Sequence, residues 1–343
     1  MKRKPLIGIL VGNSKIRPSS YFLYNQSKVN LFCFTRSAIN WSNMTISGLF
    51  LDNNQWKRGT FPFPDAVYNR LYNKSLRNVI KKISKQIGQE KVFNTFNHLD
   101  KWCVYGILNG SSLKNQLPNT FLYNEVNLID SLQSHQQMIL KPRYGNLGRN
   151  IYSIEMKDDG DLYLYRQTTR PHLIFKDPSA FLEKINSLID CKKYILQKKI
   201  EIANVNQRIF DIRTLVQKNK YGQWRVTGTL SRIAVRNFYI TNVSHDVKSV
   251  EETLLQAGMN YENVIEQIIK ISLETAKCLD GKLGLMGEIG IDLCLDYEEK
   301  PWILEVNGKP MKSLFTQLND EKVVERVFST PIEYATFLSR IKN

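Results

Sequence analysis

Two segments near the C-terminal end of the chain alternate oxygen-bearing and apolar side chains. Alternate residues of a β-strand share a face, so Glu288 and Asp292 point one way while Ile and Leu side chains point the other. Glu305 and Asn307 likewise share a face of the next segment. If the two strands pair through a turn at 297–300, Asp292, Glu305 and Asn307 converge on one patch. Such hard oxygens, with water and phosphate, are what octahedral Mg²⁺ requires. The alternative is a two-stranded edge with solvated acids, which the flanking Ile, Leu, Val and Trp residues disfavour.

A lysine ends an apolar stretch directly before a glycine-containing loop. Lys141 closes a predicted strand at 138–142, and Gly145 and Gly148 follow it. A cation at this place can neutralise phosphate oxygens while loop N–H groups donate to them. A second strand is predicted at 151–154, so the order is strand, loop, strand, unlike a P-loop, in which a helix follows. Taken alone, such a lysine is also typical of solvated surface.

Two arginines and an aspartate are predicted on one face of a central hairpin that pairs residues 211–216 with residues 224–230. Asp211, Arg213 and, across the hairpin, Arg232 carry these charges. Guanidinium groups suit bidentate recognition of carboxylate or phosphate. A surface ion pair between Asp211 and Arg213 is the alternative.

An apolar strand predicted at 194–197 changes to polar sequence at its end. Residues 197–201 could offer backbone N–H and C=O groups to a purine, with Glu201 near the ribose hydroxyls. On the residues alone, this segment is equally an ordinary strand end.

The helices and strands predicted around these residues indicate an α/β chain in three portions. Short apolar runs separated by polar turns in residues 6–75 indicate strands, and a helix is predicted at 76–87, which together form a small α/β lobe. The last portion contains the central hairpin and one long helix at about 249–279. We therefore expect three units, at residues 1–95, 96–192 and 193–343.

Composition excludes several classes of protein. The 343 residues include 48 Lys and Arg against 32 Asp and Glu, for a net charge of +16, and 42% are hydrophobic, which rules out a mainly disordered chain. No apolar run approaches the roughly 18 residues of a membrane helix. The basic, then glycine-containing N-terminus favours a first buried strand over a signal peptide. The five scattered cysteines lack metal or disulfide spacing, which fits a reducing cytoplasm.

Six motifs in order resemble those of the ATP-grasp superfamily, and most closely its YheC/YheD-type proteins, which are described as endospore coat-associated. The resemblance covers most of the chain. The motifs are Pro-Asp-Ala-Val-Tyr-Asn-Arg-Leu at 64–71, Asp-Lys-Trp-Cys-Val-Tyr at 100–105, Leu-Lys-Pro with Gly-Asn-Leu-Gly-Arg at 140–149, Asp-Ile-Arg-Thr-Leu-Val-Gln at 211–217, Thr-Asn-Val-Ser at 241–244, and Gly-Ile-Asp at 290–292 with Trp-Ile-Leu-Glu-Val-Asn-Gly-Lys-Pro at 302–310.

The resemblance implies an ATP-grasp fold, in which two α+β lobes clasp ATP after a small N-terminal α/β domain. It implies that Asp292, Glu305 and Asn307 hold Mg²⁺, and that Arg213 and Arg232 face the γ-phosphate or an acyl-phosphate intermediate. It further implies nucleotide contacts, with an adenine-binding hinge at 197–200, from the following residues: Lys101, Lys141, Gly145, Asn146, Gly148, Arg149, Gln197, Lys198, Lys199, Ile200 and Glu201.

The function implied by the resemblance is an ATP- and Mg²⁺-dependent ligase. Members with known chemistry phosphorylate a carboxylate with ATP, and an amine or thiol then displaces the phosphate. Metal and cations offset charge on the transferred group, so no protein nucleophile is required. The chain departs from the family where Gly148-Arg149-Asn150 replaces Gly-Lys-Gly and His245-Asp246-Val247 replaces Arg-Gly-Gly. A non-catalytic coat protein that keeps the fold and ATP binding is therefore the alternative.

The expected partners are ATP, a carboxylate and an amine acceptor, for which a peptide is one candidate. The charge of +16 attracts polyanions at low salt, but no recognised nucleic-acid motif is present, so specific nucleic-acid binding is disfavoured. No membrane span is expected. The cysteines predict a cytoplasmic location, and only the resemblance implies association with the spore coat.

Overall fold

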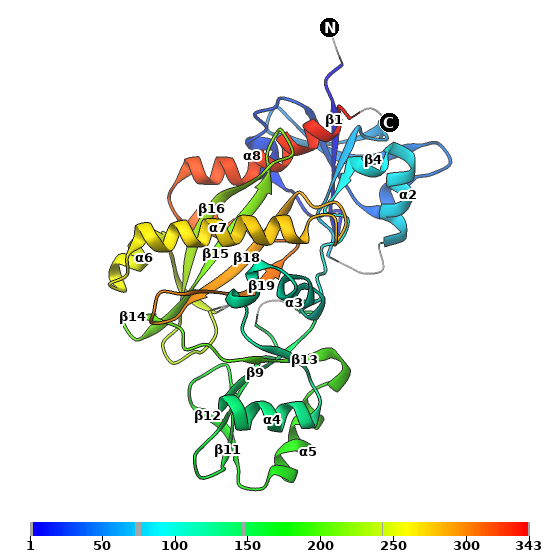
Figure 1. Cartoon of the computed structure of the whole chain (residues 1–343). Coiled ribbons are helices and arrows are strands. Elements are labelled where there is room, and N and C mark those ends of the chain that lie inside the picture. Colours follow the sequence, from blue (N-terminus) through cyan, green and yellow to red (C-terminus); the bar gives the residue numbers. More distant parts are fainter. Residues whose placement is uncertain (1–2, 73–76, 146–147, 242, 342–343) are drawn as a thin grey trace.

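Three β-sheets with helices on their faces make up the molecule. The computed structural model describes residues 3–72, 77–145, 148–241 and 243–341. In Figure 1 the N-terminal sheet lies at the top, the third sheet in the middle and the second sheet at the bottom. The predicted α/β and α+β fold class is confirmed by this mixture of helices and sheets.

The N-terminal sheet has the strand order β3-β4-β2-β1-β6-β7, with β5 paired to β4. Three of the apolar runs predicted as strands form its parallel centre, which is covered by α2 and α8. The hairpin of β4 and β5 was not predicted, although its Asn53-Asn54 turn, with φ of 46° and 60°, is typical of tight hairpins. The elements are β1 (Leu6–Leu10), α1 (Ser19–Leu23), β2 (Asn30–Phe34), β3 (Ile39–Asn40), β4 (Thr45–Asp52), β5 (Gln55–Pro62), β6 (Ala66–Asn69), α2 (Arg77–Ile87) and β7 (Val92–Phe93).

The second sheet is antiparallel, in the order β12-β11-β10-β9-β13-β8. The predicted arrangement of strand, glycine loop and strand is confirmed, since β9 and β10 pair directly. Helices α4 and α5 bury Leu128 and Phe181 against this sheet. The elements are β8 (Thr120–Leu122), α4 (Glu125–His135), β9 (Gln137–Pro142), β10 (Tyr152–Met156), β11 (Leu162–Arg166), β12 (Pro171–Phe175), α5 (Pro178–Leu188) and β13 (Tyr194–Lys198).

The third sheet has the order β17-β16-β15-β18-β19, with β14 paired to β15. Helix α7 packs against one face and α8 against the other. The single long helix predicted at 249–279 is wrong. Gly258, with φ of 73°, follows the end of α6, and the Asn260 side chain caps the start of α7 by accepting from the Asn263 N–H. The elements are β14 (Asn204–Val205), β15 (Arg208–Lys218), β16 (Trp224–Ala234), β17 (Ser244–Lys248), α6 (Val250–Gln256), α7 (Tyr261–Leu279), β18 (Glu288–Leu295), β19 (Pro301–Asn307) and α8 (Glu321–Leu338).

Helix α3 (Lys101–Asn109) links the second and third sheets. Its Asp100 cap accepts from the Trp102 N–H at 3.0 Å, and Val104 and Leu108 are buried in the same core as β15, β18 and α7. This segment was assigned to the second unit, yet its apolar side chains pack on the third sheet. The unit boundaries stay a prediction. Short 3-10 helices lie at η1 (Arg36–Ala38), η3 (Gln89–Lys91), η4 (Ser112–Gln116), η5 (Cys191–Lys193) and η6 (Lys312–Gln317).

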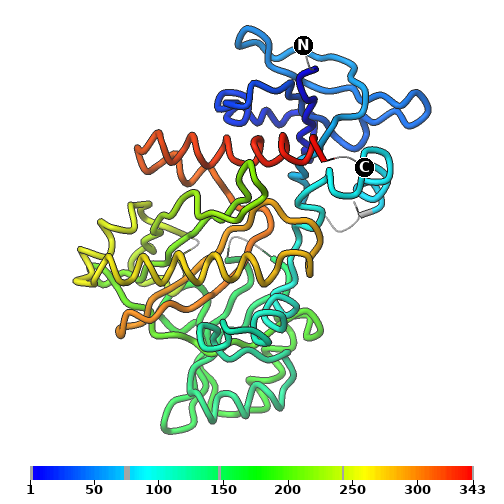
Figure 2. The backbone as a smooth tube through the Cα atoms, turned by 45° about the horizontal axis from the view of Figure 1, so that its top comes forward, coloured from blue at the N-terminus to red at the C-terminus, as the bar shows by residue number. Residues whose placement is uncertain are grey.

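Helix α8 packs between the N-terminal sheet and the third sheet (Figure 2). Phe328 and Ile332 share one core with Ile9 of β1 and Leu230 of β16. Burying each such side chain stabilises the fold by roughly 1.5–3 kcal/mol. Within the part of the chain that the structure describes, no helix is long and apolar enough to cross a membrane.

Candidate functional site

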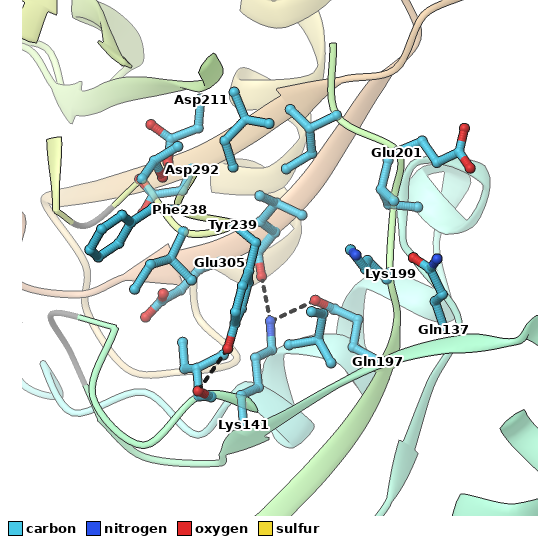
Figure 3. Close-up of a pocket in the computed structure, with 18 of the residues that line it drawn as sticks. Gln137, Lys141, Gln197, Lys199, Glu201, Asp211, Phe238, Tyr239, Asp292 and Glu305 are labelled. Carbon is cyan, nitrogen blue, oxygen red and sulfur yellow. Dashed lines mark hydrogen bonds between the residues drawn. The ribbon is translucent and has the colours of Figure 1, made fainter. Parts of the chain in front are cut away.

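A cavity of about 380 Å³ lies between the second and third sheets. One end is polar, with Lys141, Asp211, Asp292 and Glu305 in its wall. The strand end at 197–201 also lines the cavity: Gln197 lies next to Lys141, and Glu201 lies across the cavity from Asp292 (Figure 3). The remaining wall is mostly apolar, from Ile139, Ile151, Ile200, Ile202, Ile209, Phe238, Ile240 and Leu304. A flat apolar ring fits between such walls, and an anionic group fits near the cation.

Lys141 is buried at the end of β9, which shows that the solvated-surface interpretation is wrong. Its Nζ donates to Gln197 Oε1 at 2.7 Å and to the Leu304 carbonyl oxygen at 3.1 Å (Figure 3). Burial lowers the pKa of Lys141 to about 8, although Glu305 acts in the opposite direction. An ammonium has three donors, so one remains for a ligand oxygen.

Strand β13 pairs with β9, the strand that carries Lys141. The end of β13 and the residues that follow it form one edge of the cavity. Lys198 N donates to Asn119 O at 2.8 Å and Lys199 N to Gln137 O at 3.2 Å, which holds this backbone in place. Ile200 and Glu201 also line the cavity. Burial lowers the pKa of Lys199, whereas Lys198 is exposed. The structure thus brings residues 197–201 to the cavity, and their role in binding adenine stays a prediction.

Two arginines and two aspartates form a buried network on β15, β16 and β18. The strand register places Arg213 opposite Asp292 and Asp211 opposite Arg232. Arg213 Nη2 donates to Asp292 Oδ2 at 2.7 Å, and Arg232 donates both to Asp211, with Nε at 2.8 Å, and to Asp292, at 3.1 Å. Thr241 Oγ1 also donates to Asp211. The alternative of a surface Asp211–Arg213 pair is therefore wrong.

The network fixes the charge of Asp292. Burial alone would raise the pKa of this carboxyl, but Arg213 and Arg232 hold it well below its usual range. Asp211 and Asp292 in turn raise the pKa of Arg232, whereas burial acts to lower it. Asp292 is therefore ionised at neutral pH.

The predicted metal ligands lie on neighbouring strands. Asp292 is opposite Glu305 and Gly290 is opposite Asn307 in the antiparallel register of β18 and β19. Asn307 Nδ2 lies 3.5 Å from Asp292 Oδ2, and Glu305 pairs with Lys101 at 3.3 Å.

Carboxylate and amide oxygens of this kind suit Mg²⁺. Both Asp292 oxygens accept from arginines, which must release them before Asp292 could coordinate a metal. Among the described residues, no group of three or more His, Cys, Asp and Glu could hold a metal. The ligand set would therefore be two carboxylates and one amide, and it stays a prediction.

The described residues of the glycine loop do not line this cavity. Lys101 Nζ donates to the Gly145 carbonyl oxygen at 3.3 Å. Gly148, with φ of 64°, is buried, and Arg149 is exposed; neither lines this cavity. Asn146 lies outside the described residues. The nucleotide contacts implied for this loop stay a prediction.

A segment of which only Thr241 was singled out from the sequence closes one side of the cavity. Residues 236–241 reach from the third sheet to the turn between β11 and β12, where Tyr239 N donates to Gln167 O at 3.1 Å and Thr169 N to Asn237 O at 2.8 Å. The Tyr239 hydroxyl donates to the Ile151 carbonyl oxygen at 3.0 Å (Figure 3). Two adjacent aromatic residues before the Thr-Asn motif were the available sequence signal.

Glu288 lies away from the cavity, although it shares the strand of Asp292. It is fully buried and pairs with Lys312 at 2.5 Å and with Arg70 at 2.7 Å. Gln217 Nε2 donates to it at 2.9 Å, and the Tyr68 hydroxyl also donates to it. Tyr68 and Arg70 belong to the motif at 64–71, so this motif joins the N-terminal sheet to the third sheet.

Comparison with known proteins finds a matching family model and related proteins. A family model described as YheC/D-like ATP-grasp matches residues 89–338. The endospore coat-associated protein YheD of Bacillus subtilis (strain 168) is 27% identical over 358 aligned positions, which cover 98% of this chain and 79% of that protein.

Solved structures share the fold at low sequence identity. The VanG D-Ala:D-Ser ligase of Enterococcus faecalis superposes with a TM-score of 0.57 at 12% identity, covering 97% of this chain and 100% of that one. The ATP-grasp ligase PsnB, solved with a phosphomimetic variant of its minimal precursor, Mg and ADP, gives 0.56 at 13% identity, covering 97% and 98%. These likenesses show an ATP-grasp fold.

Proposed function

Because the chain belongs to the YheC/D-like ATP-grasp family, we propose that it is an ATP- and Mg²⁺-dependent ligase that activates a carboxylate as an acyl phosphate for an amine or thiol. One observation carries this proposal. A single cavity joins an apolar slot to a polar end where Lys141 and the carboxylates of Asp292 and Glu305 meet.

ATP would lie with its adenine between Ile139 and Leu304, against the backbone at 197–200. Those two side chains come from the second and third sheets and face one cavity. Glu201 lines the same cavity and would serve the ribose hydroxyls. The phosphates would then extend toward Lys141, whose remaining donor is available to them.

Glu305, Asn307 and Asp292 would hold Mg²⁺, which supplies charge neutralisation on the phosphates. Arg213 and Arg232 would face the transferred phosphoryl group and offset its charge. Asp292, Glu305 and Arg232 line the cavity, and Arg213 pairs with Asp292; in such a partly enclosed place electrostatic interactions are stronger than in water.

The reaction needs no nucleophile from the protein. A carboxylate oxygen of the substrate attacks the γ-phosphorus, and the bond to the β-phosphate oxygen breaks to leave ADP. The amine nitrogen or thiol sulfur then attacks the acyl carbon, inorganic phosphate departs, and the proton of the nucleophile passes to water. The chain's residues bind, orient and exclude water from these groups.

A screen for ADP release tests the proposal. ATP and Mg²⁺ are incubated with amino acids, short peptides and cell-wall fragments, and acceptor-dependent ADP and phosphate are measured. Glu305→Gln should abolish this release, whereas Glu298→Gln, on the exposed turn after β18, should not. Equal turnover in both variants would contradict the ligase assignment.

A non-catalytic protein that binds ATP is the second candidate. It is favoured by the two arginines that already occupy Asp292 and by the altered Gly148-Arg149-Asn150 loop. Calorimetry with ATP and Mg²⁺, followed by long incubation with acceptor mixtures, separates the two: binding with no ADP formed supports this second candidate.

The domain boundaries and the cellular location of the protein are part of the same proposal. We take residues 1–95, 96–192 and 193–343 as the N-terminal domain and the two ATP-grasp lobes, with α3 packed across the two lobes. Association with a spore coat is supported by the name of the related YheD. Cytoplasmic synthesis in a reducing environment fits the five free cysteines.

A further inference from the structure

A second cavity of about 380 Å³ shares the lining residue Glu305 with the cavity proposed to bind the nucleotide. Its wall comes from three places: the end of β6 with Arg70, the segment before α3 with Asn97, and the chain after β19 with Lys309. Glu305 lines both cavities. A molecule in the second cavity would therefore meet the polar end of the first.

The wall of this second cavity is cationic. In the lining that the structure describes, there are three cationic residues, Arg70, Lys101 and Lys309, and one carboxylate, that of Glu305. Arg70 is paired with Glu288, and Lys101 with Glu305. Lys309 is half-buried and has no hydrogen bond or ion pair with any described residue. A half-buried lysine without a hydrogen bond or ion pair favours a bound anion, because burial removes part of its hydration.

Asn97, a residue of the same wall, carries a buried hydrogen-bond acceptor that has no partner among the described residues. Its Nδ2 donates to the carbonyl oxygens of Asn69 at 3.0 Å and Leu71 at 2.9 Å, which fixes the orientation of the amide. Asn97 is 5% exposed, and its Oδ1 accepts no hydrogen bond from the described residues. A buried acceptor of this kind requires an N–H or O–H donor.

We propose that the second cavity binds the carboxylate substrate, an amino-acid or peptide derivative, with its carboxylate on Lys309 and a neighbouring N–H on Asn97 Oδ1. The proposal rests on the ligase function, since it names the group that would be phosphorylated. Lys309 would hold the substrate carboxylate beside Glu305 and reduce the repulsion between that carboxylate and the γ-phosphate.

Three small probes of matched shape test the recognition without nucleotide or metal. N-acetylglycine has both groups, N-acetylglycinamide lacks the charge, and levulinate replaces the N–H with a methylene. Binding is measured by calorimetry and by ligand-observed NMR. We expect saturable binding of N-acetylglycine at millimolar concentration, several-fold weaker binding of levulinate, and none of N-acetylglycinamide.

Variants then locate the site. Lys309→Met should weaken N-acetylglycine binding by about tenfold or more, which is typical for loss of a charge-assisted hydrogen bond. Lys309→Arg keeps the charge and should retain binding within a few-fold, which also shows that the fold is intact. Lys322→Met, at an exposed position of α8, is the matched control and should bind like the wild type.

Several results would overturn the proposal: no saturable binding of N-acetylglycine, equal binding of the neutral amide, or no effect of Lys309→Met. Displacement of the probe by ADP would also overturn it, because Lys309 would then serve the nucleotide phosphates. The ligase function fails on a different result, the absence of ADP release in the acceptor screen. The two proposals can therefore fail separately.

Discussion

At the scale of single residues, each carboxylate at the polar end of the cavity between the second and third sheets already has a cationic partner in the chain. Asp292 accepts from Arg213 and Arg232, and Glu305 pairs with Lys101. Binding of a metal and a triphosphate would exchange these partners, because the acids prefer the metal and the cations prefer the phosphates. Replacing one member leaves its partner buried and uncompensated.

Lys141 predicts a pH dependence of nucleotide binding. Its pKa of about 8 means that it is half neutral near that pH, and a bound phosphate would keep it protonated. ADP binding should therefore take up about half a proton at about pH 8 and approach one proton above it, and affinity should fall, by at most about tenfold per pH unit, as pH rises above that value. Calorimetry in two buffers of different ionisation enthalpy measures the uptake.

Lys141→Arg is the control for this prediction, because arginine stays protonated over the whole range. It should bind ADP with no proton uptake and with an affinity that changes little between about pH 7 and about pH 9. An identical uptake in the wild type and this variant would show that another group titrates.

Asp292 should contribute to stability as well as to the site. Asp292→Asn removes the charge between Arg213 and Arg232, and we expect the free energy of unfolding to fall by about 3 kcal/mol. That is near the lower end for a broken buried ion pair, because the amide still accepts hydrogen bonds. Urea unfolding measures the change. Asp130→Asn, exposed on α4, should be neutral, and a neutral Asp292→Asn would contradict the buried network.

The residues of the site were partly predictable from the sequence. Alternation along two strands was enough to bring Asp292, Glu305 and Asn307 together, because the short turn leaves little choice of partner strand. The second partner of Asp292, Arg232, depends on the order of three strands in the sheet, which alternation does not encode. For the same reason the sequence did not reveal that Glu288 pairs with the distant Arg70.

At the scale of elements, close backbone approach between segments positions the wall of the second cavity. A Cβ added to Gly308, just after β19, would lie 2.8 Å from the Asn97 carbonyl oxygen and 3.0 Å from its Cα. Backbone atoms cannot move aside as a side chain can. The segment before α3 and the end of β19 are therefore fixed against each other by a glycine.

Gly308→Ala should separate these two segments. We expect it to lower the free energy of unfolding by about 1–3 kcal/mol, as overpacking typically does. Gly106→Ala is the matched control: it lies within α3 with nothing within 4 Å of the added Cβ, so it should stabilise by about 0.5–1 kcal/mol. Thermal and urea unfolding distinguish the two signs, and a stabilising Gly308→Ala would refute the close packing.

Elements were predicted well where the pattern was local and poorly where a single residue decided the outcome. The strands β15 and β16 followed from apolar runs around an Asn-Lys-Tyr-Gly turn. The break between α6 and α7 depends on Gly258 in a left-handed conformation, and the amphipathic pattern, which was confined to the second half of the predicted helix, did not indicate it. The packing of α3 on the third sheet is a tertiary contact that no local pattern reveals.

At the scale of the whole molecule, Glu288 connects the N-terminal sheet to the third sheet. Arg70 reaches it from the end of β6, and Lys312 from the segment that leads to α8. Together with the apolar packing of α8, this buried cluster predicts that the two sheets unfold as one cooperative unit.

Glu288→Gln tests this connection. The change leaves Arg70 and Lys312 without their buried carboxylate, so we expect a loss of about 3–5 kcal/mol in the free energy of unfolding. Glu298→Gln, on an exposed turn, should change it by less than about 0.5 kcal/mol. Probes placed in both sheets and followed during urea unfolding should report one shared transition for the wild type. Separate transitions of the two sheets in Glu288→Gln would show that Glu288 couples them.

The same variant should alter the response to acid. Burial would raise the pKa of Glu288, but Lys312 and Arg70 lower it to about 2, below its ordinary value of 4.5. A carboxyl with a lowered pKa in the folded state adds stability that is complete above about pH 4.5 and is lost as pH falls toward about 2. The stability difference between wild type and Glu288→Gln should therefore shrink over that interval. Parallel curves would mean that the carboxylate is not ionised in the folded protein, and the ion pairs that join the two sheets would then be absent.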